Sequence, residues 1–224
     1  MPCDLGYKQI NKIKIPAPAP QEFKEKIKPP EVDADLLEKI GENDLAFLEW
    51  LNDLDIKPLL EKALSAAKQK IGDSGLLKSS IDENGNLIIS GSFKNNSEKK
   101  RLESATSALS EQFQFEVLKI VAELLDYELV LSKGKNGEPI LEGEKDTDSG
   151  VHKYLKVTKD KNGNGVLAFE HFASKEELSS EEEKFLGLAQ KLGVKISVEE
   201  TKRSGQPLPA NAVHKDFLHH GRNE

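Results

Sequence analysis

VHKYLKVTKDKNGNGVLAFEHF, residues 151–172, is the stretch that decides the fold. Residue types that favour strands stand on both sides of Asn162-Gly163. Asn and Gly accept the positive φ that tight hairpin turns require, so the stretch predicts two antiparallel strands joined by a turn. The same pair recurs at Asn84-Gly85, where we expect a type I′ turn, and at Asn136-Gly137. Three such turns, each flanked by strand-forming residues, predict an antiparallel meander.

Helical periodicity marks the rest of the chain. Apolar residues recur every three or four positions between residues 97 and 126, which predicts one long helix whose second half lies in the core. Three short helices are expected between residues 33 and 71, with Asn43 capping the second and Asp55 the third. Ser174 and Glu177 form a capping box that starts a last helix. A half-buried closing strand should follow Gly193.

These patterns predict an α+β fold. It consists of an antiparallel meander of about five to seven strands, with a long central helix and a C-terminal helix packed on it, preceded by a small N-terminal helical unit. The expected division of the chain is an extended, Pro-rich basic arm (1–32), the helical unit (33–72), the α+β domain (76–200) and a flexible tail (201–224).

Composition narrows the classes of function. The net charge of −7 over 224 residues argues against a dedicated nucleic-acid binder, because affinity for phosphate backbones rests on clustered Lys and Arg. No apolar run approaches the roughly 18 residues of a membrane-spanning helix, and the first thirty residues lack an apolar segment. We therefore expect a soluble cytoplasmic protein that contacts no membrane. Cys3 is the only cysteine, which excludes an internal disulfide.

One loop resembles part of an EF-hand. Asp160, Asn162 and Asn164 stand at positions 1, 3 and 5 of such a calcium-binding loop. Position 12, where the family places a bidentate Glu, is His171, and Glu170 lies one residue away. Because imidazole is a poor ligand for calcium, the sequence favours a turn between strands over a calcium site.

The C-terminal segment offers a second candidate metal site. His214, His219 and His220 could bind zinc or nickel, but they form no pair at the four-residue spacing that places two ligands on one helical face. A polar tail with incidental histidines is the favoured interpretation.

No nucleotide-binding, nucleophile or zinc-protease motif occurs in the chain, and we predict no cofactor. The favoured function is a non-catalytic interaction or assembly module that binds a protein partner or itself. One alternative is a calcium- or transition-metal-responsive protein. Another is an enzyme with a pocket on the sheet, built from His152, Tyr154, Glu170 and His171, in which strand alternation would place His171 on the face of Phe169.

Overall fold

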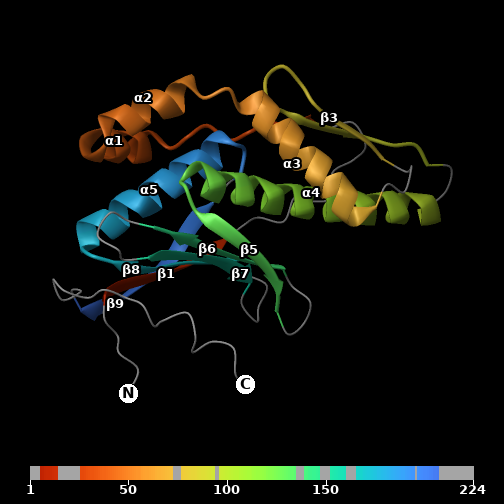
Figure 1. Ribbon diagram of the computed structural model, residues 1–224. Helices are drawn as coiled ribbons and strands as arrows, with labels where there is room; N and C mark the ends of the chain where they lie inside the picture. The colour runs from red at the N-terminus through yellow and green to blue at the C-terminus, as the bar shows by residue number, and fades with distance from the viewer. Residues whose placement is uncertain are drawn as a thin grey trace. The chain divides into compact units, whose positions relative to one another are not determined.

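A computed structural model of the chain describes residues 6–14, 26–72, 77–93, 96–134, 139–146, 152–159, 165–194 and 196–206 (Figure 1). These residues form helices and antiparallel strands, which confirms the predicted α+β class. Among them, no helix combines the length and the apolar character needed to cross a bilayer.

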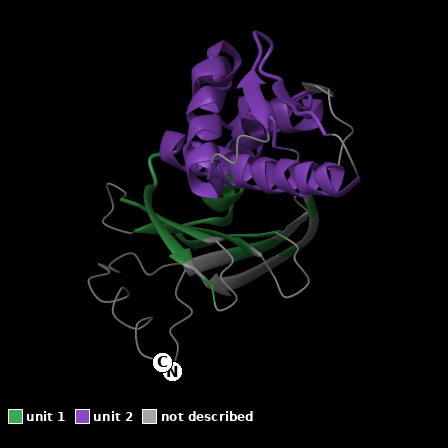
Figure 2. Ribbon diagram, turned by 90° about the vertical axis from the view of Figure 1, so that its right-hand side faces the viewer, with its two compact units in different colours: residues 1–14, 126–182, 198–224 green, residues 15–125, 183–197 purple. Residues whose placement is uncertain are grey.

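The chain folds into two compact units, which Figure 2 draws in green and purple. Unit 1 comprises Met1–Lys14, Asp126–Glu182 and Val198–Glu224, and unit 2 comprises Ile15–Leu125 and Glu183–Ser197. Each unit is therefore built from segments that lie far apart in the sequence.

Unit 1 is built on a six-stranded sheet with the strand order β5-β6-β7-β8-β1-β9. Consecutive strands from β5 to β8 pair antiparallel, as the meander predicts. β1 pairs antiparallel with β8, so part of the predicted N-terminal arm is a strand inside the sheet (Figure 1). The strands are β1 (Gly6–Lys14), β5 (Glu128–Lys133), β6 (Pro139–Lys145), β7 (Lys153–Lys159), β8 (Gly165–Phe172) and β9 (Ser197–Gln206).

A bulge near the end of β8 changes the predicted alternation of its side chains. The register with β1 shifts between Tyr7 and Gln9, and His171 adopts a positive φ of 67°. Phe169 and Phe172 are consequently both fully buried, with ring centroids 6.0 Å apart. Simple alternation would place His171 beside Phe169, and this expectation is wrong because the extra residue of the bulge brings Phe172 to the buried face.

The described residues of unit 2 form the helices α1 to α4, the second part of α5 and a small sheet with the strand order β2-β4-β3. The long helix α4 matches the predicted helix and buries one stripe of apolar residues against neighbours that include α3. The elements are β2 (Lys26–Ile27), α1 (Ala34–Asn43), α2 (Leu45–Asp53), α3 (Ile56–Ile71), β3 (Lys78–Ile81), β4 (Leu87–Ser90) and α4 (Asn96–Leu124).

Helix α5 (Lys175–Lys191) follows β8, with residues up to Glu182 in unit 1 and the remainder in unit 2. Its predicted capping box is confirmed, because the Glu177 N–H donates to Ser174 Oγ at 3.1 Å and the Glu177 carboxylate accepts from the Ala173 N–H. Of the other two predicted caps, Asp55 is confirmed. Asn43 is wrong, since it is the last residue of α1 and Asp44 accepts the N–H of Phe47 at the start of α2.

The hairpin between β3 and β4 exists, but its turn differs from the prediction. Gly85 has a positive φ of 74° and Asn84 does not, so the turn is not type I′. Instead, the Asp82 carboxylate accepts the N–H groups of Asn84 and Asn86, each at 2.9 Å, and organises a longer loop. In this Asp-x-Asn-Gly sequence, the aspartate carboxylate therefore holds the backbone of the loop through hydrogen bonds.

The closing strand begins later than predicted. Val194 and Ile196 are buried as expected, but β9 starts only at Ser197, and Val198 is exposed. β9 continues to Gln206, into the segment that the sequence assigns to the tail.

Candidate functional site

Both predicted metal sites lie outside the described residues. Asp160, Asn162 and Asn164 belong to the segment between β7 and β8, and His214, His219 and His220 follow the end of β9. Among the residues that the structure does describe, no group of three or more His, Cys, Asp or Glu side chains is arranged to hold a metal ion. Metal binding by the two predicted sites therefore stays a prediction.

The residues of the enzyme hypothesis are only partly brought together. Tyr154 and Glu170 are direct register partners on β7 and β8. His152 is exposed and lies 2.6 Å from Asp146, just beyond the end of β6. Burial raises the pKa of Tyr154, and its hydrogen bond to Glu142 raises it further, so this phenol stays protonated at neutral pH. A protonated phenol cannot act as a base here.

Unit 1 contains a polar cluster between α5 and the sheet. We call it the α5 carboxylate cluster, and it consists of Glu177, Glu181 and Glu182 with their partners on the strands. Each carboxylate contacts a different strand: Glu177 contacts β7, Glu181 contacts β6 and Glu182 contacts β1.

Glu182 contacts β1 through two amides. The side-chain amides of Gln9 and Asn11 both donate to its carboxylate, and Gln9 also donates to Asn11 Oδ1 at 3.2 Å. Gln9 and Asn11 are completely buried, and Glu182 is nearly so. Buried amides need hydrogen-bond partners, so Glu182 fixes where β1 meets α5.

Glu177 and Glu181 contact two lysines that are register partners on β6 and β7. Lys145 donates to Glu181 at 3.2 Å, and Lys153 lies 2.6 Å from Glu177. Burial alone would raise the pKa of Glu177, but the hydrogen bond and charge of Lys153, together with the N–H groups of Ala173 and Ser174, outweigh burial and lower the pKa. Each lysine also lies over an aromatic ring: Lys145 over Tyr127 and Lys153 over Phe172.

Tyr127 completes this cluster. Burial raises the pKa of its phenol far above the usual value, and the Glu181 carboxylate adds to the shift. Its hydroxyl makes no hydrogen bond of ordinary geometry within the described residues, so Glu181 acts on it through charge. All three carboxylates thus have partners in the sheet, and their role is to hold α5 on it.

A different feature of unit 1 is open to a partner. β5 is the first strand of the sheet order, and its side away from β6 pairs with no described strand. We call this side the β5 edge. Val130 is 64% exposed and Leu131 45% exposed, at the centre of the strand. Unpaired N–H and C=O groups beside exposed apolar side chains form a template for strand addition.

The opposite end of the sheet has a different character. β9 reads SVEETKRSGQ, with two acidic and two basic residues within its central six. Charged residues on an edge strand discourage pairing with other chains. The centre of β5, by contrast, is Leu-Val-Leu. The two edges of one sheet therefore differ in the feature that controls edge-to-edge association.

The β5 edge was not among the sites predicted from the sequence. The segment YELVLSK predicts a strand, but the sequence does not reveal that this strand is the last in its sheet. Its apolar centre with charged ends, Glu128 and Lys133, is the signal that could have pointed to it.

Comparison with known proteins adds no relative from which a function could be transferred. No protein-family model, no curated protein and no solved structure matches this chain.

Proposed function

We propose that this protein is a non-catalytic assembly module that associates with a second copy of itself by pairing β5 with β5. The observation that carries the proposal is the exposure of Val130 and Leu131 on a terminal strand. Soluble proteins usually protect such strands, so an exposed apolar edge is a candidate contact surface.

The sequence of β5 allows an antiparallel register that pairs its apolar residues. A two-fold axis perpendicular to the sheet keeps each side chain on its own face, so two copies of ELVLSK can be centred on Val130 opposite Val130. Leu129 of each copy then stands opposite Leu131 of the other, on the other face. Apolar pairs across strands stabilise such a register. A two-fold axis relates the copies, so the contact closes at two chains and does not propagate.

The expected complex is weak. One six-residue strand from each chain makes a small interface, in the range typical of transient contacts. Backbone hydrogen bonds supply most of the attraction, and the burial of Val130 and Leu131 adds to it. The dimer should therefore form and dissociate with protein concentration.

The α5 carboxylate cluster supports a non-catalytic role for unit 1. Its three carboxylates are engaged by lysines and amides of the sheet, as expected of residues that hold a helix in place.

Sedimentation velocity of the full chain tests the proposal. Between about 1 μM and about 1 mM, a span that covers binding free energies of about −8 to −4 kcal/mol, the wild type should shift from monomer to dimer. Val130→Lys should stay monomeric, because it places a charge at the centre of the contact. The side chain is already exposed, so circular dichroism should be unchanged.

Val198→Lys is the matched control. It introduces the same charge at an exposed valine on β9, the other terminal strand, and should leave the dimer intact. A wild type that stays monomeric throughout the range would overturn the proposal. A dimer that Val198→Lys weakens while Val130→Lys does not would also overturn it.

A further inference from the structure

An open groove of about 520 Å³ lies in unit 2 along the first half of α4. The C-terminal end of α3 contributes Ile71 and Gly72 to its wall. The rest of the lining comes from one side of α4: Ser97, Lys100, Arg101, Ser104, Ala105 and Ala108. The volume falls within the range of small-molecule sites.

Two adjacent cationic side chains line the groove. Lys100 and Arg101 are exposed and make no ion pair with any residue that the structure describes. Some other lysines of unit 2 do make such pairs, among them Lys62 with Glu123 and Lys70 with Glu116. The groove therefore presents two positive charges in a chain whose net charge is −7.

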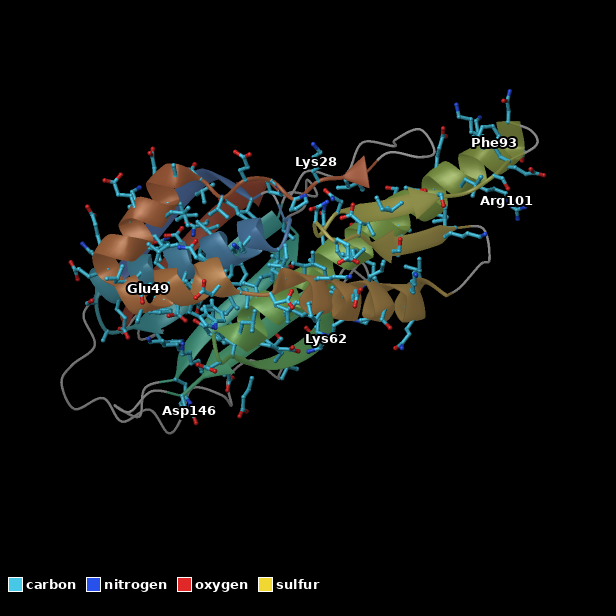
Figure 3. The ribbon with its side chains drawn as sticks, turned by 90° about the horizontal axis from the view of Figure 1, so that it is seen from above. Lys28, Glu49, Lys62, Phe93, Arg101 and Asp146 are labelled. Carbon is cyan, nitrogen blue, oxygen red and sulfur yellow. The ribbon has the colours of Figure 1, made fainter. Side chains whose placement is uncertain are left out.

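The groove also offers hydrogen-bond donors. The hydroxyls of Ser97 and Ser104 line it beside the two cations. Lys100 and Arg101 lie in the first two turns of α4, which begins at Asn96, and the dipole of a helix favours negative charge near its N-terminus (Figure 3). The guanidinium group of Arg101 presents a planar fork of donors suited to a phosphate, sulfonate or carboxylate group.

The remaining wall is apolar. Ile71 is 38% exposed, and Ala105 and Ala108 leave space above the surface of α4. An apolar group placed there would remove Ile71 from water. The end of α3 carries backbone carbonyls, which disfavour an anion, so the charged end of a ligand belongs on the side of α4.

From these features we infer that the groove binds a small amphiphilic anion. Lys100, Arg101 and the two serines would hold its oxyanion group, and Ile71 with the two alanines would contact its apolar body. This inference concerns unit 2 and is independent of self-association through β5.

The test uses 8-anilinonaphthalene-1-sulfonate, an aromatic sulfonate, as the probe and the folded full chain as the receptor. Binding is measured by calorimetry and mapped by the shifts of backbone amide signals. We expect the largest shifts between residues 71 and 108. The double variant Lys100→Glu with Arg101→Glu should lower the affinity at least about tenfold, since hydrogen bonds to charged groups are lost.

Two further variants make the result specific. Lys28→Glu with Lys39→Glu changes the net charge equally at exposed positions outside the groove and should keep wild-type affinity. Ala108→Leu leaves both cations in place but fills the apolar side of the groove, and it too should weaken binding. The inference fails if the wild type does not bind the probe, if the amide shifts map elsewhere, or if the control weakens binding as much as the groove variants.

Discussion

Glu116 is the most thoroughly engaged carboxylate of unit 2. It is almost completely buried on α4, and Lys70, Lys119 and Gln112 all donate to it, at 2.7, 3.1 and 2.8 Å. Burial alone would raise its pKa, but the hydrogen bonds from Lys70, Lys119 and Gln112 and the charge of Lys119 together outweigh burial and lower the pKa. The charged form of Glu116 therefore stabilises the folded state.

This arrangement predicts how stability depends on pH. In the unfolded chain the pKa of a glutamate is roughly 4.3, above that of Glu116 in the folded protein. The stabilisation is thus fully present above about pH 5 and is lost as the pH falls through the folded pKa. Glu116→Gln should lower the free energy of unfolding at pH 7, and the difference from wild type should shrink towards pH 3.

Urea unfolding at pH 7, 5, 4 and 3 measures this difference. Glu103→Gln is the control, because Glu103 pairs only loosely with Lys99, at 3.8 Å on the surface of the same helix. The prediction would be contradicted if the difference in the free energy of unfolding between Glu116→Gln and wild type stayed constant over the whole pH range.

Gly187 shows a steric constraint at a single residue. It lies inside α5, and a Cβ added there would stand 2.7 Å from Ile40 Cδ1 and 3.5 Å from Leu51 Cδ2. The helix backbone itself would tolerate alanine, which stabilises helices by up to about 1 kcal/mol relative to glycine. The close approach of α1 and α2 is what requires glycine here.

Gly187→Ala should therefore destabilise unit 2 by about 1–2 kcal/mol, because overpacking outweighs the gain in helix propensity. Ile40→Val removes the clashing Cδ1 atom, so the alanine should cost less in that background. Fluorescence of Trp50, the only tryptophan, follows unfolding next to Leu51. Strictly additive effects of the two substitutions would show that the clash is not the cause.

At the scale of elements, α5 is held on the sheet by its acidic residues. Glu182→Ala would leave the buried amides of Gln9 and Asn11 without their acceptor and should lower the free energy of unfolding by about 3 kcal/mol. Glu182→Gln keeps a carbonyl acceptor and should cost less. Far-UV circular dichroism in urea measures both variants.

Glu49→Ala serves as the control, because Glu49 is exposed on α2 (Figure 3). It should leave the free energy of unfolding within about 0.5 kcal/mol of wild type. If Glu182→Ala behaved like this control, the α5 carboxylate cluster would not position the helix.

The elements also show what a sequence reveals and what it hides. The strands from β5 to β8, helix α4 and the capping box of α5 follow from local patterns, because periodicity and caps act within a few residues. The bulge at His171 and the pairing of β1 with β8 depend on residues far apart in the chain. The sequence alone suggests a solvated helix face at Glu177, Glu181 and Glu182. Their partners lie on strands that are distant in the sequence, so only the folded structure shows the contacts.

At the scale of the whole molecule, the β5 edge could not be predicted from the sequence, because it too depends on residues far apart in the chain. A strand is recognisable from YELVLSK, but whether it is central or terminal depends on the order of the whole sheet. The insertion of β1 between β8 and β9 leaves β5 at one end and the charged β9 at the other. The proposed self-association through β5 thus depends on the topology of the sheet as well as on the sequence of the strand.

Disulfide trapping in solution tests the β5 pairing most directly. Two chains are prepared in which Ser replaces Cys3, the only native cysteine; one carries Leu129→Cys and the other Leu131→Cys. In the proposed register these two cysteines face each other, and opposite Cα atoms on antiparallel strands are 4.5–5.5 Å apart, within reach of a disulfide. A cysteine and the same cysteine of the second copy are two residues out of register, which places their Cα atoms beyond the roughly 7 Å that a disulfide can span.

We predict that mild oxidation of an equal mixture yields mainly the mixed disulfide between positions 129 and 131, identified by mass spectrometry. The yield should fall when both chains also carry Val130→Lys. Chains that remain uncrosslinked, or that form the two like disulfides as readily as the mixed one, would contradict pairing through β5.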